Sequence, residues 1–171
     1  SIGIALNIDT KLIQKGIKEI KFVEGRMELF KTKDKKNIVI DYAHTPDAYV
    51  KVLTTLKEMV PEKNSIHILF GCGGNRDKIK RPQMGKIAEE FSEKLWITCD
   101  NPRYENIKDI NSDITKEMVG NNFEIIKDRG TALSAAINEI DSGDLLVILG
   151  KGRENFQDIE GNKFSYSDIE I

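Results

Sequence analysis

The chain has 171 residues, with 26 basic and 28 acidic side chains and a formal net charge of −2. A hydrophobic fraction of 39% excludes a disordered chain, and the balanced charge gives no basis for binding nucleic acid or an anionic membrane. No apolar run approaches the ~20 residues of a membrane span, and the first residues lack the pattern of a signal peptide. The two cysteines, Cys72 and Cys99, form no CxxC pattern, so we expect small buried residues in a cytoplasmic protein.

Hydrophobic periodicity and turn residues predict helices and strands that alternate along the chain. The first half is predicted to contain a helix over 10–20 capped by Asp9, strands over 26–31 and 37–41, a helix that begins at Thr45-Pro46-Asp47, and a strand over 66–70. The second half is predicted to contain a helix after Pro82, a strand over 95–98, a helix over 106–119, a strand over 123–126, a helix over 129–140, a strand over 145–149, and a hairpin of 156–159 and 163–166 around Gly161-Asn162.

This alternation predicts an α/β fold whose mostly parallel sheet is covered by helices on both faces. The strand over 145–149 is apolar throughout, as expected for a strand covered on both sides. In such sheets the ligand crevice lies beyond the carboxyl ends of the strands. Four polar or glycine-rich segments follow predicted strands, and we expect them to line one rim: Asp41–His44, Gly71–Arg81, Asp100–Arg103 and Gly150–Glu154.

The segment Gly71-Cys72-Gly73-Gly74-Asn75-Arg76-Asp77 directly follows a predicted strand. Its glycines would let the backbone approach an anion and expose amide donors to it, with positive charge added by Lys78, Lys80 and Arg81. It is neither a dinucleotide fingerprint nor a Walker loop, and GxxxxGK[ST] occurs nowhere in the chain. The alternative is a tight turn before a solvated basic helix start.

The other three segments each allow a binding interpretation and a structural one. Asp41 and His44 precede a helix N-terminus, where a carboxylate suits sugar hydroxyls and the helix end suits phosphate; both could equally serve the turn itself. Asp100-Asn101-Pro102-Arg103 could bind an amino-acid carboxylate, or it could be an Asx-Pro turn. Glu154, after Gly150, could take an ammonium group or lie in a simple turn. His67, inside an apolar strand, is expected to be structural.

Together these segments resemble the Mur ligase family, specifically the C-terminal domain of its UDP-N-acetylmuramoyl-tripeptide synthetases (the MurE type). Gly25-Arg26-Met27-Glu28, Gly150-Lys151-Gly152 and Tyr166-Ser167-Asp168 also fit, and all motifs occur in family order. The resemblance implies a Rossmann-like C-terminal domain over 26–171 with a truncated last helix. It also implies that residues 1–25 are the tail of the preceding central ATP-binding domain.

The resemblance implies an ATP-dependent, ADP-forming ligase that adds a diamino acid to UDP-MurNAc-L-Ala-D-Glu in bacterial peptidoglycan synthesis. The Asp-Asn-Pro-Arg sequence resembles the form found in ligases for meso-diaminopimelate, where the arginine meets the distal carboxylate that lysine lacks. By the same resemblance, Arg26, Asp41 and His44 lie on the nucleotide side. The amino-acid side is implied to consist of Arg76, Asp100, Asn101, Arg103, Gly150 and Glu154.

Two departures from the family pattern stand out. Arg153 occupies a position where many relatives have histidine, and the 171 residues include no Walker loop. We therefore expect a fragment, inactive alone, without catalytic residues or metal ligands of its own and with no ATP or Mg²⁺ bound. Its expected partners are the missing domains and the small-molecule substrates. The alternatives are a stand-alone ligand-binding module and another ligase of this fold, of the folylpolyglutamate or cyanophycin synthetase type.

Overall fold

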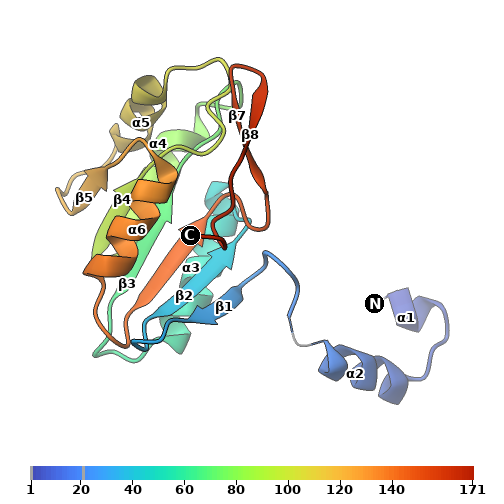
Figure 1. Ribbon diagram of the computed structural model, residues 1–171. Coiled ribbons are helices and arrows are strands. Elements are labelled where there is room, and N and C mark those ends of the chain that lie inside the picture. The colour runs from blue at the N-terminus through green and yellow to red at the C-terminus, as the bar shows by residue number, and fades with distance from the viewer. Residues whose placement is uncertain (1, 21) are drawn as a thin grey trace.

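The computed structural model of the chain, described for residues 2–20 and 22–171, contains a six-stranded sheet with helices on both faces (Figure 1). Only the edge strand β1 runs antiparallel to its neighbour, and the other strands are parallel. In spatial order the strands are β1 (Glu28–Lys31), β2 (Asn37–Asp41), β6 (Leu145–Leu149), β3 (Ile66–Phe70), β4 (Lys94–Ile97) and β5 (Phe123–Ile125). The predicted α/β fold is confirmed.

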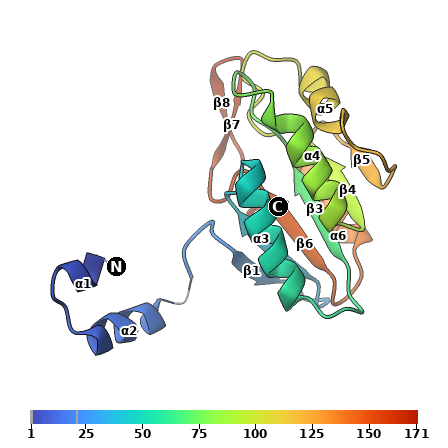
Figure 2. The ribbon, with the colours of Figure 1, turned by 180° about the vertical axis from the view of Figure 1, so that it is seen from behind.

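Helices cover both faces of the sheet (Figures 1 and 2). The first face packs against α3 (Pro46–Met59), α4 (Lys80–Phe91) and α5 (Ile107–Thr115), the second against α6 (Arg129–Glu139). Alternate residues of each central strand point to the two cores, so Val147 lies in the first core and Ile148 in the second. This covering of both faces explains why β6 is apolar throughout.

Side-chain caps begin most of these helices where the sequence predicts them. The Thr45 hydroxyl accepts a hydrogen bond from the Ala48 amide at the start of α3, and Asp128 accepts one from the Thr131 amide at the start of α6. The start of α4 differs from the prediction, because the helix begins at Lys80 rather than after Pro82. Pro82 is tolerated there because the first-turn amides of a helix have no intrahelical partner.

Three further boundaries correct the predictions. β1 begins at Glu28 rather than 26, and α5 ends at Thr115 rather than 119. The terminal hairpin of β7 (Phe156–Ile159) and β8 (Asn162–Ser165) turns at Glu160-Gly161 rather than Gly161-Asn162. Both turn residues have positive φ, 52° and 78°, which is the conformation that a two-residue hairpin turn of type I′ requires.

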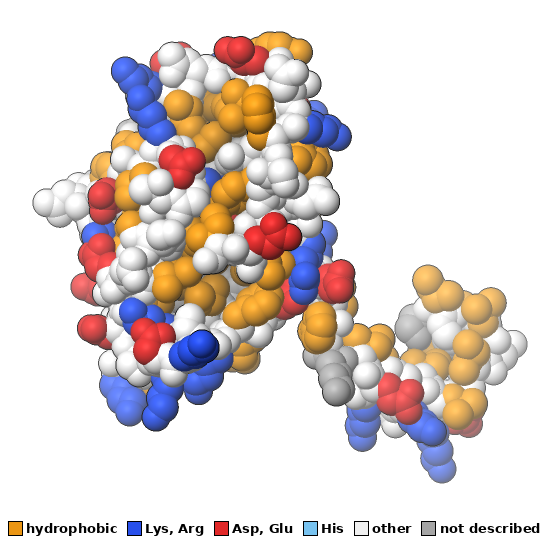
Figure 3. Space-filling view, in the orientation of Figure 1, with side chains coloured by type: hydrophobic (Ala, Val, Ile, Leu, Met, Phe, Trp, Pro, Cys, Tyr) orange, Lys and Arg blue, Asp and Glu red, His pale blue; other side chains and the backbone are white. Residues whose placement is uncertain are grey.

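The N-terminal segment lies apart from this α/β domain (Figures 1 and 2). It contains α1 (Ile2–Ala5) and α2 (Thr10–Glu19), and neither helix has a buried residue. Apolar side chains gather on its surface in Figure 3, and Leu12, Ile17 and Ile20 are each more than 60% exposed. None of the helices in the described part of the chain is long and apolar enough to cross a membrane.

Candidate functional site

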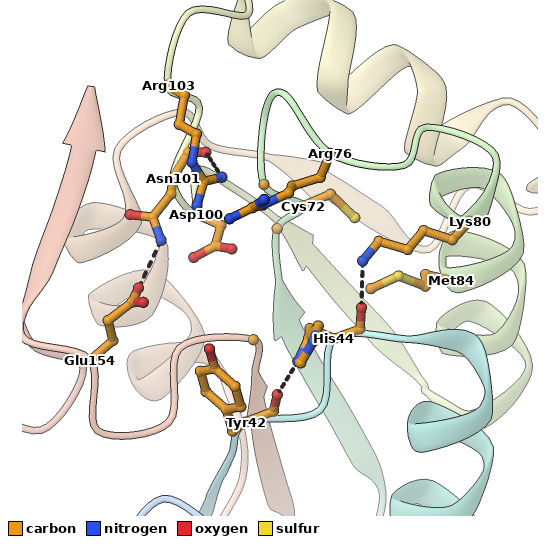
Figure 4. Close-up of a pocket in the computed structure, with 13 residues that line it drawn as sticks. Tyr42, His44, Cys72, Arg76, Lys80, Met84, Asp100, Asn101, Arg103 and Glu154 are labelled. Carbon is orange, nitrogen blue, oxygen red and sulfur yellow. Dashed lines mark hydrogen bonds between the residues drawn. The ribbon is translucent and has the colours of Figure 1, made fainter. Parts of the chain in front are cut away.

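The carboxyl ends of β2, β3, β4 and β6 surround a cleft of about 280 Å³, which we call the strand-end cleft (Figure 4). The expectation that four distant segments meet at one rim is confirmed, because the central position of β6 brings its end between those of β2 and β3. The cleft is lined by Tyr42, His44, Gly71, Cys72, Gly73, Arg76, Lys80, Met84, Asp100, Asn101, Arg103, Gly150 and Glu154.

Glycines allow the loop after β3 to pack directly on the backbone of the loop after β4. A Cβ on Gly71 would lie 2.2 Å from the Thr98 carbonyl oxygen, and one on Gly74 would lie 1.8 Å from the Pro102 carbonyl oxygen. The Gly74 amide donates a hydrogen bond to the Asn101 carbonyl at 2.8 Å. These two glycines are therefore required by backbone packing, whether or not a ligand is bound.

Of the three basic residues expected to add positive charge beside the glycine loop, two are paired with carboxylates in the structure. Arg81 is fully buried and donates hydrogen bonds to Glu105, to Asp113 and to the Gly73 carbonyl. Lys78 pairs with Glu105 at 2.9 Å. Hydrogen bonds from Arg81 and then Lys78 lower the pKa of the Glu105 carboxyl to about 2. Lys80 does line the cleft, where it donates to the His44 carbonyl.

A second buried cation organises the opposite wall of the cleft. The Lys151 ammonium lies 2.7 Å from Glu154 Oε2, 3.3 Å from Asn101 Oδ1 and 3.4 Å from Asp100 Oδ1. Asn101 also donates its amide N–H to Glu154 Oε2 at 2.7 Å (Figure 4). We call Asp100, Asn101, Glu154 and Lys151 the acidic corner. Burial works against the charge of Glu154, but hydrogen bonds from Lys151 and Asn101 outweigh it and lower its pKa.

Two arginines reach the strand-end cleft from other sides. Arg76 is exposed and has no ion pair among the described residues. Arg103 is partly held by the protein, since its Nη1 donates to the Gly74 carbonyl at 2.9 Å and its Nε lies 3.7 Å from Asp158. Its backbone has a φ of 51° and pairs with the terminal hairpin, because the Arg103 amide donates to the Asp158 carbonyl and the Arg103 carbonyl accepts from the Glu160 amide. The cleft thus combines a net negative corner with available guanidinium groups.

The three residues expected on the nucleotide side lie in different surroundings. His44 lines the strand-end cleft, and its Nδ1 lies 2.9 Å from the Tyr42 carbonyl oxygen. Arg26 lies in a second hollow of about 340 Å³ beside the cleft, with its guanidinium carbon 4.7 Å from the centre of the Tyr42 ring. Asp41 is buried, and its two oxygens accept hydrogen bonds from the Met27 and Ala43 amides.

Arg153, the departure from the family pattern, has a structural partner. Its Nε donates to Glu28 Oε2 at 2.9 Å, and its Nη2 pairs with the other oxygen of that carboxylate. Glu28 also accepts a hydrogen bond from the Gly25 amide. Hydrogen bonding to Arg153 is the main cause that lowers the pKa of Glu28. This pair ties the edge strand β1 to the loop after β6.

Arg129 is a further buried residue that the sequence analysis did not single out. It donates to both carboxylate oxygens of Asp168, at 2.8 and 2.9 Å, and to the Leu149 carbonyl at 3.1 Å. Arg129 also lies 3.5 Å from the Cys99 carbonyl, so it fixes the ends of both β4 and β6. Lys151, Arg81 and Arg129 were missed as organisers because nothing in the local sequence shows that their charges are buried.

The remaining candidates behave as structural residues. His67 is buried and contacts Asp144 at 3.1 Å, as expected of a structural histidine. Burial raises the pKa of the Cys72 thiol to about 12 and that of Cys99 to about 11, which leaves both thiols protonated. Among the described residues no group of three or more potential ligands could hold a metal ion.

Residues 25–152 match the family model described as Mur ligase, glutamate ligase domain. The diaminopimelate-adding UDP-N-acetylmuramoyl-L-alanyl-D-glutamate ligase of Chlorobaculum tepidum is 39% identical and aligns with 99% of this chain and 34% of its own length. That of Rickettsia bellii is 42% identical over 96% of this chain and 34% of its own. The chain therefore spans about a third of the length of these curated relatives.

Solved structures give the same picture of the fold. A UDP-N-acetylmuramoyl-L-alanyl-D-glutamate–2,6-diaminopimelate ligase superimposes with a TM-score of 0.80 at 34% identity, covering 98% of this chain and 34% of that one. A bifunctional folylpolyglutamate synthase/dihydrofolate synthase from Yersinia pestis superimposes with a TM-score of 0.64 at 17% identity, over 84% of this chain and 32% of its own. The second likeness shows a shared fold alone.

Proposed function

Because the chain belongs to the Mur ligase family through its glutamate ligase domain, we propose that it supplies the amino-acid-binding part of an ATP-dependent ligase. The proposed reaction joins meso-diaminopimelate to UDP-N-acetylmuramoyl-L-alanyl-D-glutamate in peptidoglycan synthesis. Relatives named for this reaction are 37–42% identical to the chain over most of its length, which supports this choice of substrate.

The charge pattern of the strand-end cleft is the observation that carries the proposal. Diaminopimelate has an ammonium and a carboxylate at each end. The cleft presents carboxylates that can pair with an ammonium and guanidinium groups that can pair with a carboxylate. The acidic corner holds two carboxylates against one ammonium, so one negative charge remains to attract a substrate ammonium. Arg76 and Arg103 offer the fork-shaped donors that suit a carboxylate.

In the proposed reaction ATP phosphorylates the glutamyl carboxylate and leaves as ADP. The neutral diaminopimelate amine then attacks the acyl phosphate, and phosphate leaves as the amide bond forms and the amine nitrogen loses a proton. The contribution of this chain is to bind the diamino acid and orient its amine, so that binding energy offsets the entropic part of the reaction barrier.

We extend the proposal to the nucleotide side and to the N-terminal segment. Arg26 and His44 are proposed to approach ATP from the second hollow and from the cleft, while Asp41 holds the amides of Met27 and Ala43 and thereby shapes this wall.

Residues 1–25 are proposed to belong to the preceding ATP-binding domain. The exposed apolar side chains of α2 support this, because such a face is stable only when it is covered.

The test is amide-bond formation by the complete protein that contains this chain. Purified enzyme is incubated with ATP, Mg²⁺ and UDP-MurNAc-L-Ala-D-Glu, together with meso-diaminopimelate, L-lysine or L-glutamate. We expect product with diaminopimelate and much less with the other two amino acids. Product with L-lysine at equal efficiency would contradict the proposed substrate. In a parallel assay with a folate in place of the UDP-linked acceptor, ligation of L-glutamate would favour the alternative ligase of the same fold.

A further inference from the structure

We propose that Lys151 is a positioning residue for the amino-acid substrate, whose buried ammonium fixes Asp100, Asn101 and Glu154 so that they present a preformed ammonium site to the strand-end cleft. The inference rests on the proposed function for the identity of the substrate. It concerns a residue that lies behind the cleft and is absent from the residues that line it.

The geometry matches the three donors of an ammonium to three acceptors. The Lys151 side chain is 0% exposed, and its Nζ lies within 3.4 Å of one oxygen each from Glu154, Asn101 and Asp100. The acceptors come from two loops, the one after β4 and the one after β6. The buried ammonium therefore bridges the two loops that carry the acidic corner, alongside the direct hydrogen bond from Asn101 to Glu154.

Lys151 occupies only one oxygen of each carboxylate. Asp100 Oδ2 and Glu154 Oε1 accept no hydrogen bond within the described part of the chain, and both residues line the cleft. Figure 4 shows the two carboxylates on the same side of the cleft, with Arg76 reaching in from the glycine loop. The free oxygens are thus available to a substrate ammonium, while the occupied ones keep the side chains in place.

The charge balance makes this arrangement dependent on Lys151. With the ammonium present, the acidic corner has a net charge of −1, which a substrate ammonium neutralises. Without it, the two carboxylates face one another in a partly buried site, and one of them is expected to retain a proton at higher pH. Protonation or movement of Asp100 or Glu154 would remove the ammonium site, although the substituted residue, Lys151, does not itself line the cleft.

Kinetics of the complete enzyme test the proposal. In Lys151→Met we expect the KM for diaminopimelate to rise by about 30-fold or more, while the KM for ATP stays within about threefold, as for loss of a buried charge partner. A merely structural role would lower kcat through loss of folded enzyme and leave both KM values unchanged. Lys151→Gln, which keeps two N–H donors, serves the same test if the methionine variant does not fold.

Lys94→Met is the matched control. Lys94 also contacts two carboxylates, those of Glu124 and Glu139, but it does so at the opposite ends of the strands. We expect its removal to leave the KM for diaminopimelate unchanged. An unchanged KM for diaminopimelate in a folded Lys151 variant would overturn the proposal.

A second measurement is independent of the proposed reaction. Carbon-13 NMR of the Glu154 carboxyl in the 171-residue chain should give a pKa below the ordinary value in the wild type and a clearly higher pKa in Lys151→Met. An equal pKa in both would overturn the positioning role. If the complete enzyme makes no product with any diamino acid, the proposed function fails, and this titration still decides whether Lys151 organises the acidic corner.

Discussion

Charged side chains around the strand-end cleft are of two kinds, buried and solvent-facing. Arg81, Arg129 and Lys151 have fully buried side chains, and each contacts at least one carboxylate, as buried charges must. Arg76 and Lys80 are open to the cleft. The buried cations fix the loops after β3, β4 and β6, and the exposed ones remain available to a ligand.

Arg103 offers a test of substrate choice. Arg103→Ala is expected to lower kcat/KM for diaminopimelate by about 30-fold or more, because a substrate carboxylate loses its charge-assisted partner. The change also removes the hydrogen bond to the Gly74 carbonyl, so thermal unfolding must be measured alongside. The relevant measurement is amide-bond formation by the complete enzyme with diaminopimelate and with L-lysine.

Arg103→Lys is the companion variant, and we expect it to recover the activity only in part because lysine cannot form a bidentate fork. A variant Arg103→Ala that still preferred diaminopimelate over lysine would assign the distal carboxylate to another residue, with Arg76 as the next candidate.

Glu105 offers a test of pH-dependent stability. Its pKa of about 2 in the folded protein lies below the ordinary 4.5, so folding stabilises the ionised form. This contribution is complete above pH 4.5 and is lost as the pH falls toward 2. Glu105→Gln should therefore reduce the free energy of unfolding by about 1.5–3 kcal/mol at pH 7 and by much less near pH 2.

Urea unfolding across this pH range measures the effect. Glu124→Gln is the control, since Glu124 forms a half-exposed pair with Lys94 at 3.6 Å and should contribute little at any pH. A Glu105→Gln difference that stayed constant between pH 7 and pH 2 would show that Glu105 acts through packing rather than through its charge.

At the scale of single elements, α2 differs from the helices of the α/β domain. Its Asp9 cap and apolar stripe are those of a stable helix, yet no residue of it is buried and nothing in the domain covers the stripe. Isolated helices shorter than about 12–15 residues are marginal in water, and α2 has 10 residues. Its helical structure therefore depends on a partner surface.

Hydrogen exchange of the 171-residue chain should show this difference directly. We expect the amides of α2 to exchange within the first time points, while those of the central strand β6 stay protected to near the global free energy of unfolding. Protection of α2 equal to that of β6 would mean that the segment docks firmly on the domain in solution.

At the scale of the whole molecule, the proposed function assigns to the α/β domain one wall of an ATP site rather than a complete site. The sequence has no GxxxxGK[ST] loop, Arg26 and His44 lie in adjacent but separate hollows, and Asp41 is buried. We expect weak or undetectable ATP binding by the 171-residue chain in calorimetric titration. Tight binding, in the low micromolar range, would show that the domain binds the phosphates of ATP without another domain.

The sequence by itself determined the order of the elements, most of their limits, and the four segments that follow the strands. These depend on short-range causes: residue periodicity, helix caps such as Thr45, and glycine or proline at turns. Predicted boundaries were wrong where a long-range contact determines where an element begins. At the start of α4, for example, Arg81 in the first turn is held by Glu105 and Asp113.

Only the tertiary structure decided that β6 inserts between β2 and β3 and that Lys151 is a buried cation rather than a surface one. Both outcomes depend on residues far away in the sequence: Lys151 meets Asp100 across 51 positions, and Arg129 meets Asp168 across 39. Whether a side chain is buried depends on all the residues that pack around it, including those distant in sequence. The local pattern Gly150-Lys151-Gly152 therefore indicates a turn, but it does not show that the Lys151 ammonium is buried behind the strand-end cleft.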